Sequence, residues 1–315
     1  MAVRLCQEIS NRLGVTLGPW ILFQAPTLKT LTVALSSNTS GEQRSPIVPL
    51  KPRGNGAPIF MIPGMYGDVM ELRALTNAIV SDRPLYGIRA RGLAPGETPH
   101  HSVEEIAKDY VEHLRRVQPS GPYTLVGYSF GGLVAFEVAC LLQDAGEKVE
   151  FLGLVDTDVH DRSLKWPERL AFLIMRPLRY AGLVARAPIA HGTEIWRRFF
   201  RTRSFGLPPG NMDDVMSPLL QRVASLNRRA FARFRPRRYD GMLTIFRAIE
   251  RWPRFCDPLP IWRRLATDGL IIHEMPGNHF ALMQGEGVRV LGRRISGLTA
   301  EARRQDGQPQ KVLAS

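Results

Sequence analysis

The sequence predicts an α/β fold with a mostly parallel central sheet and helices on both of its faces. Short apolar runs alternate with helix-length amphipathic segments through most of the 315 residues, which is the pattern of parallel α/β proteins. A glycine-flanked serine stands directly between one such run and the next helical segment. Hydrophobic residues make up 44% of the chain and charged residues 23%, a globular composition that excludes wholesale disorder.

Six apolar runs are the candidate strands of this sheet. They are short and bounded by turn-forming residues, as expected for parallel strands that are covered on both faces. Between them, Ser102 and Glu105 form a capping box for a helix that reaches about Val117. A second helix is predicted over residues 132–145, before Gly146. The candidate strands are residues 58–62, 85–88, 123–126, 151–155, 242–246 and 270–274.

Two stretches interrupt this alternation and divide the chain. Residues 37–56 are rich in Ser, Pro, Gly and charge, and are predicted to be a linker. Residues 158–238, called the insertion below, contain no clear strand but several Arg-rich helical segments. A stretch of this length between strands is expected to be structured and functional. The main domain is therefore expected at 57–298, followed by a mobile polar tail at 299–315.

The net charge of +13 is concentrated in the insertion, which holds 17 Lys and Arg against six Asp and Glu. This excess fits either a solvated helical surface or attraction for an acidic protein partner. The cluster of Arg233, Arg235, Arg237 and Arg238 is the expected centre of such an attraction. No zinc-finger, RNP or basic-zipper pattern is present, so nucleic-acid binding is not expected.

The cysteines and the hydropathy of the sequence indicate the cellular compartment. Cys6, Cys140 and Cys256 are odd in number and far apart, which indicates neither a disulfide framework nor a zinc site. No apolar run approaches the roughly 18 residues that a transmembrane helix needs. The first 15 residues lack the apolar core of a secretory signal. The sequence therefore predicts a cytoplasmic protein with no membrane span.

The strongest chemical motif is Gly127-Tyr128-Ser129-Phe130-Gly131, placed between a predicted strand and a predicted helix. In α/β hydrolases a serine on such a tight turn has a strained backbone that leaves its hydroxyl exposed above the sheet. The flanking glycines leave room for this turn, and the helix N-terminus favours developing negative charge at the serine. Ser129 is therefore the predicted nucleophile of an α/β-hydrolase fold, with an inert turn serine as the alternative.

A serine nucleophile needs a base, and the base needs an orienting acid. In α/β hydrolases the acid and then the histidine follow the serine along the chain. Of the seven histidines, His279 lies in a loop directly after the last predicted strand, within Pro276-Gly277-Asn278-His279-Phe280. His273 lies inside that strand, and His113 lies in a helix on a face expected to be exposed. His279 is therefore the predicted base.

Four carboxylates are candidates for the acid. Asp156 comes first because it ends the run at 151–155, beside the predicted nucleophile strand. Asp257, after the penultimate predicted strand, is the second choice, and Asp158 and Asp161 remain open although they lie farther along the loop.

An oxyanion hole needs two backbone N–H donors directed at the tetrahedral oxygen. Phe130, the residue after the nucleophile, supplies one. The loop after the first predicted strand, Pro63-Gly64-Met65-Tyr66-Gly67, is expected to supply the other from Met65.

These motifs resemble the thioesterase domains that end nonribosomal peptide and polyketide synthetases. The resemblance covers about residues 57–295 and implies the triad Ser129, Asp156 and His279, with the insertion acting as a helical lid over the acyl chain. One departure is Ile62, where the family often has a histidine. The matching segments are residues 86–93, 102–105, 121–132, 134–137, 154–157 and 276–280.

The N-terminus is similar to another family. Residues 2–15 and 22–28 resemble the back half of an acyl or peptidyl carrier domain. The resemblance implies a phosphopantetheine-bearing serine a residue or two before Met1. Because about 36 residues are too few to bury a core unaided, residues 1–36 are expected to be a partial carrier segment, with a genuine helical extension as the alternative.

Together the motifs and the resemblance predict a serine thioesterase. It would accept an acyl or peptidyl chain from the phosphopantetheine of a carrier domain and release it by hydrolysis or cyclisation. The partner is the carrier or its synthetase module, and no metal or bound cofactor is predicted. A free carboxylesterase or lipase and a catalytically silent hydrolase-fold binding module are the alternatives.

Overall fold

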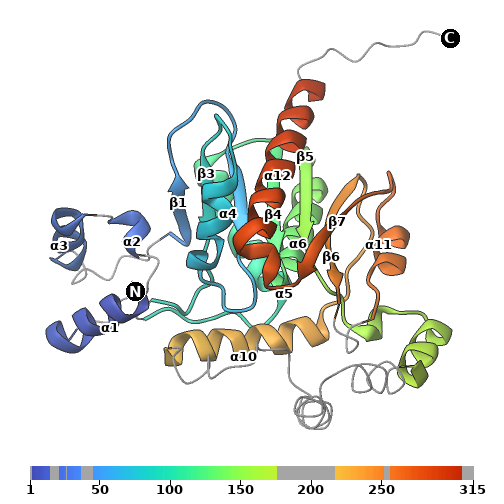
Figure 1. Cartoon of the computed structure of the whole chain (residues 1–315), viewed down its shortest axis with the longest axis horizontal. Coiled ribbons are helices and arrows are strands. Elements are labelled where there is room, and N and C mark those ends of the chain that lie inside the picture. Colours follow the sequence, from blue (N-terminus) through green and yellow to red (C-terminus); the bar gives the residue numbers. More distant parts are fainter. Residues whose placement is uncertain are drawn as a thin grey trace.

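The computed structural model describes residues 2–14, 21–25, 27–36, 45–94, 96–175, 217–251 and 256–306. At its centre is a seven-stranded sheet in the order β1-β3-β2-β4-β5-β6-β7 (Figure 1). The edge strand β1 is antiparallel to β3, and the other neighbouring pairs are parallel. The strands are β1 (Ile47–Lys51), β2 (Ile59–Ile62), β3 (Leu85–Ile88), β4 (Tyr123–Tyr128), β5 (Val149–Val155), β6 (Leu243–Glu250) and β7 (Leu270–Asn278).

Helices cover both faces of the sheet, which confirms the predicted α/β-hydrolase architecture (Figure 1). Helices α5 and α6 pack on one face together with α11, and α4 and α12 pack on the other. The described helices are α1 (Ala2–Leu13), α2 (Ile21–Gln24), α3 (Leu28–Ser36), α4 (Arg73–Ala78), α5 (Val103–Val117), α6 (Phe130–Asp144), α10 (Pro218–Arg233), α11 (Leu259–Leu265) and α12 (Gly285–Asp306).

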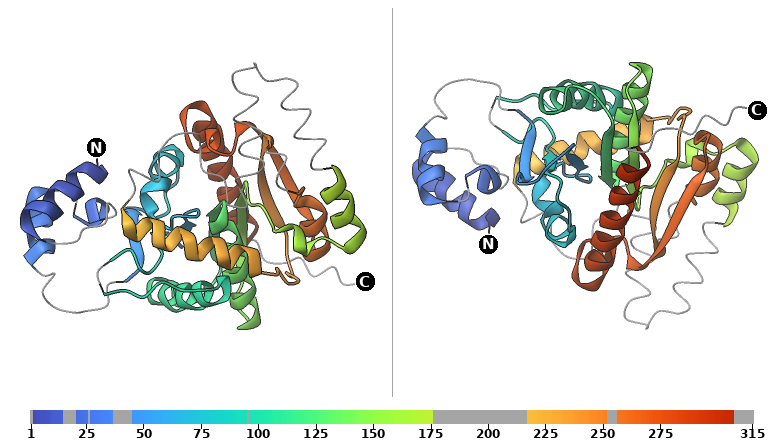
Figure 2. Two further views of the ribbon diagram at one scale, coloured as in Figure 1. Left: turned by 90° about the horizontal axis from the view of Figure 1, so that it is seen from below. Right: turned by 90° about the horizontal axis from the view of Figure 1, so that it is seen from above.

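The N-terminal helices lie at the β1 edge of the sheet rather than over a face (Figure 2). Cys6 and Ile21 are buried in a small apolar cluster with Val48 of β1 and Val69, a residue of the short 3-10 helix η2 (Val69–Leu72). Residues 1–36 were expected to be a partial carrier segment, and their described parts are helical and share this cluster with the main domain.

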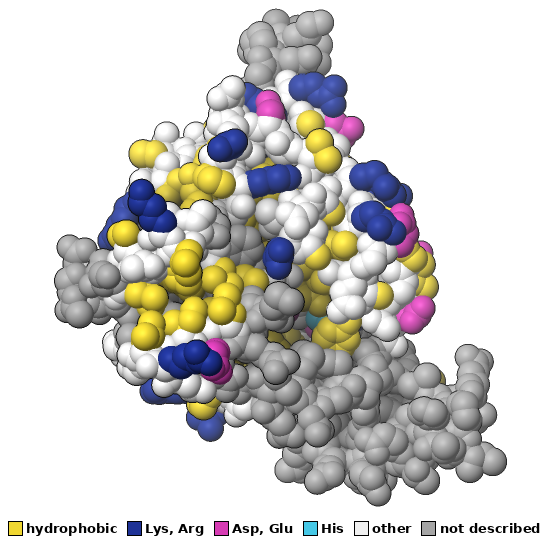
Figure 3. All heavy atoms as spheres, turned by 60° about the vertical axis from the view of Figure 1, so that its left-hand side comes forward, with side chains coloured by type: hydrophobic (Ala, Val, Ile, Leu, Met, Phe, Trp, Pro, Cys, Tyr) yellow, Lys and Arg dark blue, Asp and Glu magenta, His cyan; other side chains and the backbone are white. Residues whose placement is uncertain are grey.

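Most of the described part of the insertion is helical. Residues 166–175 form a helix, and α10 runs along the edge at which the parallel strands end (Figure 1). Residues 176–216, which hold seven of the 17 basic residues of the insertion, lie outside the described residues. On the face shown in Figure 3, Lys and Arg side chains are spread among hydrophobic and uncharged ones rather than joined in one patch.

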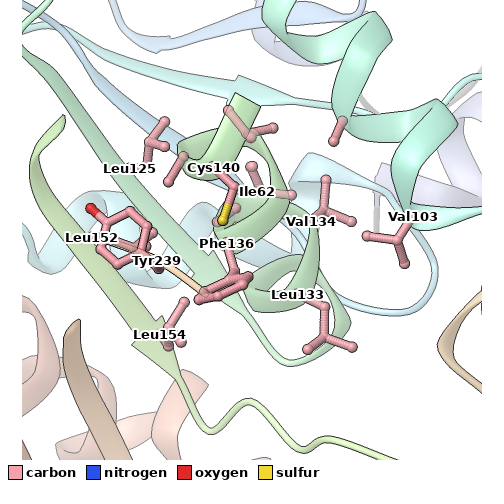
Figure 4. Packing of buried hydrophobic residues seen from close by; sticks show 14 of the residues in the cluster. Ile62, Val103, Leu125, Leu133, Val134, Phe136, Cys140, Leu152, Leu154 and Tyr239 are labelled. Carbon is pink, nitrogen blue, oxygen red and sulfur yellow. The ribbon is translucent and has the colours of Figure 1, made fainter. Parts of the chain in front are cut away.

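The core beneath the predicted nucleophile is built around α6, which is buried on nearly all sides. Figure 4 shows Phe136 and Cys140 of this helix beside Leu152 and Leu154 of β5. The Phe136 ring also lies 5.0 Å from the ring of Trp262 in α11, centroid to centroid. Burial of each such side chain is worth about 1.5–3 kcal/mol, so the N-terminus of α6 is held firmly against the sheet.

All six candidate strands are present; β3 has the predicted bounds, and the other five differ at one or both ends. The first begins one residue late, at Ile59, while β4 continues to Tyr128 and β7 to Asn278. Helix α6 begins at Phe130 rather than at residue 132. Strand β4 and helix α6 are therefore separated by Ser129 alone, which makes the predicted turn tighter than the sequence indicated.

Two predicted boundaries are wrong. The linker at 37–56 contains β1, in which Ile47 and Val48 are buried against the sheet. Its Pro49 is tolerated because an edge strand leaves one side of the ladder unpaired. The tail at 299–315 begins inside α12, where Thr299 is only 1% exposed and its hydroxyl donates to the Ile295 carbonyl. Residues 307–315 lie outside the described residues.

The expectation for His113 is also wrong. Its helix α5 presents this side chain to the interior, where it is 5% exposed. Its Nδ1 lies 2.8 Å from the Asp109 carbonyl oxygen one turn earlier, so the ring is satisfied within the helix.

Candidate active site

Ser129 occupies the strained turn that the motif predicts. Its φ of 55° and ψ of −121° lie in a region that non-glycine residues rarely adopt. The turn is held by its N–H, which donates to the Val155 carbonyl of the neighbouring strand at 2.8 Å. A Cβ on Gly127 would collide with the Gly131 carbonyl oxygen, and one on Gly131 with the Pro63 carbonyl oxygen. Both glycines are therefore needed for this backbone path.

Asp156 and His279 meet at the strand ends beside this turn. His279 Nδ1 lies 2.7 Å from Asp156 Oδ2. The other carboxylate oxygen, Oδ1, accepts the Ala248 N–H at 2.9 Å, and the Asp156 N–H donates to the Phe246 carbonyl at 2.7 Å. Backbone groups of β6 thus hold both the main chain and the carboxylate of Asp156.

Electrostatics favour an ionised Asp156. Burial raises its pKa, but the hydrogen bond and charge of His279, the Ala248 amide and the nearby Arg251 outweigh burial, so the pKa lies below its usual value. An ionised carboxylate can only accept a hydrogen bond. Asp156 therefore favours the tautomer in which His279 carries its proton on Nδ1, leaving Nε2 free to accept one.

The other acids considered from the sequence are engaged elsewhere. Asp156 is the one of the four that is hydrogen-bonded to His279. Asp257 accepts the Leu259 N–H at 3.1 Å, in the turn that leads into α11. The other ion pairs are Asp158 with Arg251 at 2.6 Å, Asp161 with Arg169 at 3.1 Å, and Asp257 with Arg247 at 3.3 Å.

Tyr128 orients His279, a role that motif analysis missed. The two rings stack with centroids 5.0 Å apart and an interplanar angle of 22°. The Tyr128 hydroxyl donates to the His279 carbonyl at 3.1 Å. Asn278 adds a turn by accepting the Phe280 N–H at 3.1 Å. His273, by contrast, stacks on Phe246 within the sheet, as expected of a structural residue.

Residues 63–67, called the oxyanion loop below, lie next to the serine turn. Two side chains from other elements hold this loop. The Gly64 N–H donates to Glu71 Oε2 at 2.7 Å, and Asn227 of α10 donates through Nδ2 to the Met65 carbonyl at 2.9 Å. Within the described residues, the N–H groups of Met65 and Phe130 have no acceptor. Both are available to a substrate oxygen.

The described residues contain neither a cluster of metal-ligating side chains nor a membrane-spanning helix. Among the described residues, no three His, Cys, Asp or Glu side chains gather closely enough to bind a metal ion. No described helix is long and apolar enough to cross a bilayer.

A parallel sheet with a strained serine between strand and helix, and an acid–histidine pair at the following strand ends, defines the α/β-hydrolase class. Comparison with known families narrows this assignment. Residues 57–298 match the family of thioesterase domains. The chain belongs to this family.

Relatives of the chain are much longer proteins. Indigoidine synthase of Dickeya dadantii (strain 3937) is 45% identical over 155 residues, which make up 49% of this chain and 10% of that protein. Malpibaldin synthetase of Mortierella alpina is 30% identical over 305 residues, 94% of this chain and 5% of that protein. The chain therefore spans only a small part of the length of these curated relatives.

A solved structure supports the fold. The NocB thioesterase domain from the nocardicin cluster superposes with a TM-score of 0.56 at 21% sequence identity. The match covers 81% of this chain and 98% of that domain. At this identity the likeness concerns the fold.

Proposed function

We propose that the chain is a serine thioesterase that releases an acyl or peptidyl chain from the phosphopantetheine thioester of a carrier domain. One observation carries the proposal: the 2.7 Å contact between His279 and Asp156, placed beside a strained serine in a member of the thioesterase family. Thioester release is the reaction that this constellation and this family have in common.

The geometry supports a two-step acyl transfer. In the first step Ser129 Oγ attacks the thioester carbonyl carbon while His279 takes its proton, and Asp156 stabilises the resulting imidazolium. The N–H groups of Met65 and Phe130 bind the oxygen of the tetrahedral intermediate. The C–S bond then breaks, and His279 donates this proton to the departing sulfur, so that pantetheine leaves as a thiol. Water then releases the acyl group from Ser129 by hydrolysis, or an amine, hydroxyl or carbon nucleophile of the bound acyl or peptidyl chain releases it by cyclisation.

The proposed partner is the carrier domain or synthetase module that presents the substrate. Its phosphopantetheine arrives with the acyl chain, so the thioesterase needs no cofactor of its own. Helix α10 offers a basic surface beside the oxyanion loop, with four arginines and no acidic residue in its 16 positions. The free, widely separated cysteines support a reducing, cytoplasmic location.

Intact-protein mass spectrometry tests this proposal. The wild type, incubated with a series of acyl pantetheine thioesters, should gain the mass of the acyl group, and Ser129→Ala should not. Rapid turnover of nitrophenyl esters with no reaction of pantetheine thioesters would favour a free esterase. Failure of a fluorophosphonate probe to label Ser129 would favour a silent binding module.

A further inference from the structure

Glu71 lies at the active site without belonging to the predicted triad. It is the third residue of η2, and its carboxylate reaches back to the oxyanion loop to accept the Gly64 N–H at 2.7 Å. Gly64 immediately precedes Met65, the proposed oxyanion donor. The hydrogen bond to Glu71 therefore restrains the peptide next to the one whose N–H must point at the substrate oxygen.

The contact is tight on both sides of Gly64. A Cβ at this position would lie 3.1 Å from Glu71 Oε2 and 3.3 Å from the ring of Tyr128. Since Tyr128 also stacks on His279, the Glu71 carboxylate, the oxyanion loop and the histidine form one packed group.

The charge of Glu71 is set by this environment. Withdrawal from water raises its pKa to about 7, although the Gly64 amide and the charge of His279 favour the ionised form. The titratable groups that face it are Asp68 at the start of its own helix, Tyr128 at the end of β4, and His279 after β7. Burial likewise raises the pKa of Asp68, to about 6, and that of Tyr128 well above its usual value.

We propose that Glu71 is a positioning residue whose ionised carboxylate fixes the oxyanion loop through the Gly64 amide and so directs the Met65 N–H at the substrate oxygen. This inference rests on the proposed function. A carboxylate accepts a shorter and stronger hydrogen bond than a neutral group does. Protonation of Glu71 weakens the restraint, and the donor is then held less well during formation of the tetrahedral intermediate.

The charge of Glu71 sets the pH at which its variants should differ from the wild type. Glu71 is ionised above about pH 7 and neutral below it. Glu71→Gln retains an oxygen that can accept the Gly64 N–H but stays neutral at every pH. The variant should therefore differ most from the wild type at pH 8 and resemble it at pH 6. Glu71→Ala lacks the acceptor and should be impaired throughout this range.

The test measures kcat and KM for a small neutral pantetheine thioester between pH 5.5 and 8.5. At pH 8, Glu71→Ala should lose about 10- to 100-fold in kcat with little change in KM, since removal of a whole oxyanion donor costs about 10²–10³. Glu71→Gln should lose several-fold at pH 8 and approach the wild type at pH 6. Glu112→Gln, an exposed glutamate of α5, is the matched control and should match the wild type throughout.

Thermal melting separates this role from a loss of folding, since a positioning role moves kcat without a large change in Tm. The inference would be overturned if the ratio of the wild-type kcat to that of Glu71→Gln stayed constant with pH, or if the substitution changed KM alone. Acyl-enzyme formation by the wild type would still uphold the proposed function. A wild type that reacts with neither thioesters nor a fluorophosphonate would overturn both.

Discussion

The two halves of the candidate site are held in different ways. On one side, Asp156 and His279 stand at strand ends, and β6 binds the acid through the backbone groups of Phe246 and Ala248. On the other side, the far end of the oxyanion loop has backbone hydrogen bonds, from the Gly67 N–H to the Gly64 carbonyl and from the Ala90 N–H to the Gly67 carbonyl. The groups that flank the Met65 N–H are instead held by single side-chain hydrogen bonds to Glu71 and from Asn227.

This difference has consequences for both function and adaptability. The acid–histidine half inherits the rigidity of the sheet, so its geometry survives most changes outside the reacting residues themselves. The oxyanion half depends on side chains from η2 and α10, which can be replaced one at a time. Substitutions should therefore affect the first half in an all-or-none way and the second half gradually.

The largest effect is expected for Ser129→Ala. The variant keeps the turn, because alanine is smaller than serine and the flanking glycines still provide the space, but it lacks the nucleophile. Acyl-enzyme should be undetectable, and turnover should fall by several orders of magnitude. Mass spectrometry and a thermal melt together measure the result. Near-normal turnover with an unchanged Tm would refute the assignment of the nucleophile.

The second-largest loss of activity is expected for Asp156→Asn. The amide can still accept the Ala248 N–H, but its NH₂ group faces His279 Nδ1 and favours the wrong tautomer. We expect a loss of about 10⁴ in kcat at neutral pH. Asp257→Asn is the control, because Asp257 pairs with Arg247 rather than with His279. If Asp257→Asn were the more impaired of the two, the acid would have to be reassigned.

The same division separates what the sequence could predict from what it could not. The buried strands, Ser129, Asp156 and His279 follow from local patterns, because an apolar run and the residues at its end are adjacent in the chain. Strand β1 was missed since an edge strand with a proline and a lysine lacks the pattern of a buried one. Glu71 and Asn227 carry no motif, and only the fold brings them to the oxyanion loop.

A smaller effect is expected for Asn227→Ala. Asn227 is 4% exposed, and its removal leaves the Met65 carbonyl without the bond from α10. A hydrogen bond of this kind contributes about 0.5–1.5 kcal/mol, and Met65 is only half-buried. We expect kcat to fall about 10-fold.

Asn77→Ala, at an exposed position of α4, is the matched control for this variant. An equal change in kcat for the two variants would mean that α10 does not hold the loop in place. The oxyanion half would then depend on Glu71 and on the backbone hydrogen bonds of Gly67.

The smallest effect concerns encounter with a carrier domain, and here the structure changes which arginines to test. Within the predicted cluster, Arg237 pairs with Asp144 at 2.7 Å and Arg238 with Asp240 at 3.4 Å. These charges are partly neutralised by acidic side chains of the same chain. Arg222, Arg229 and Arg233 are exposed on α10, which has no acidic residue of its own, so they are the better candidates for attracting an acidic carrier.

Charge reversal at Arg222, Arg229 and Arg233 should therefore slow turnover of a carrier-bound thioester several-fold at low salt and leave a small neutral thioester unaffected. Steering acts over long range and is screened within about 8 Å at physiological ionic strength. Added salt should reduce the wild-type rate with the carrier substrate and remove most of the difference from the variant. Arg304→Glu, near the far end of α12, is the control. If both substrates depend equally on salt, the α10 arginines form a solvated surface, and recognition of the carrier must come from contacts in which they take no part.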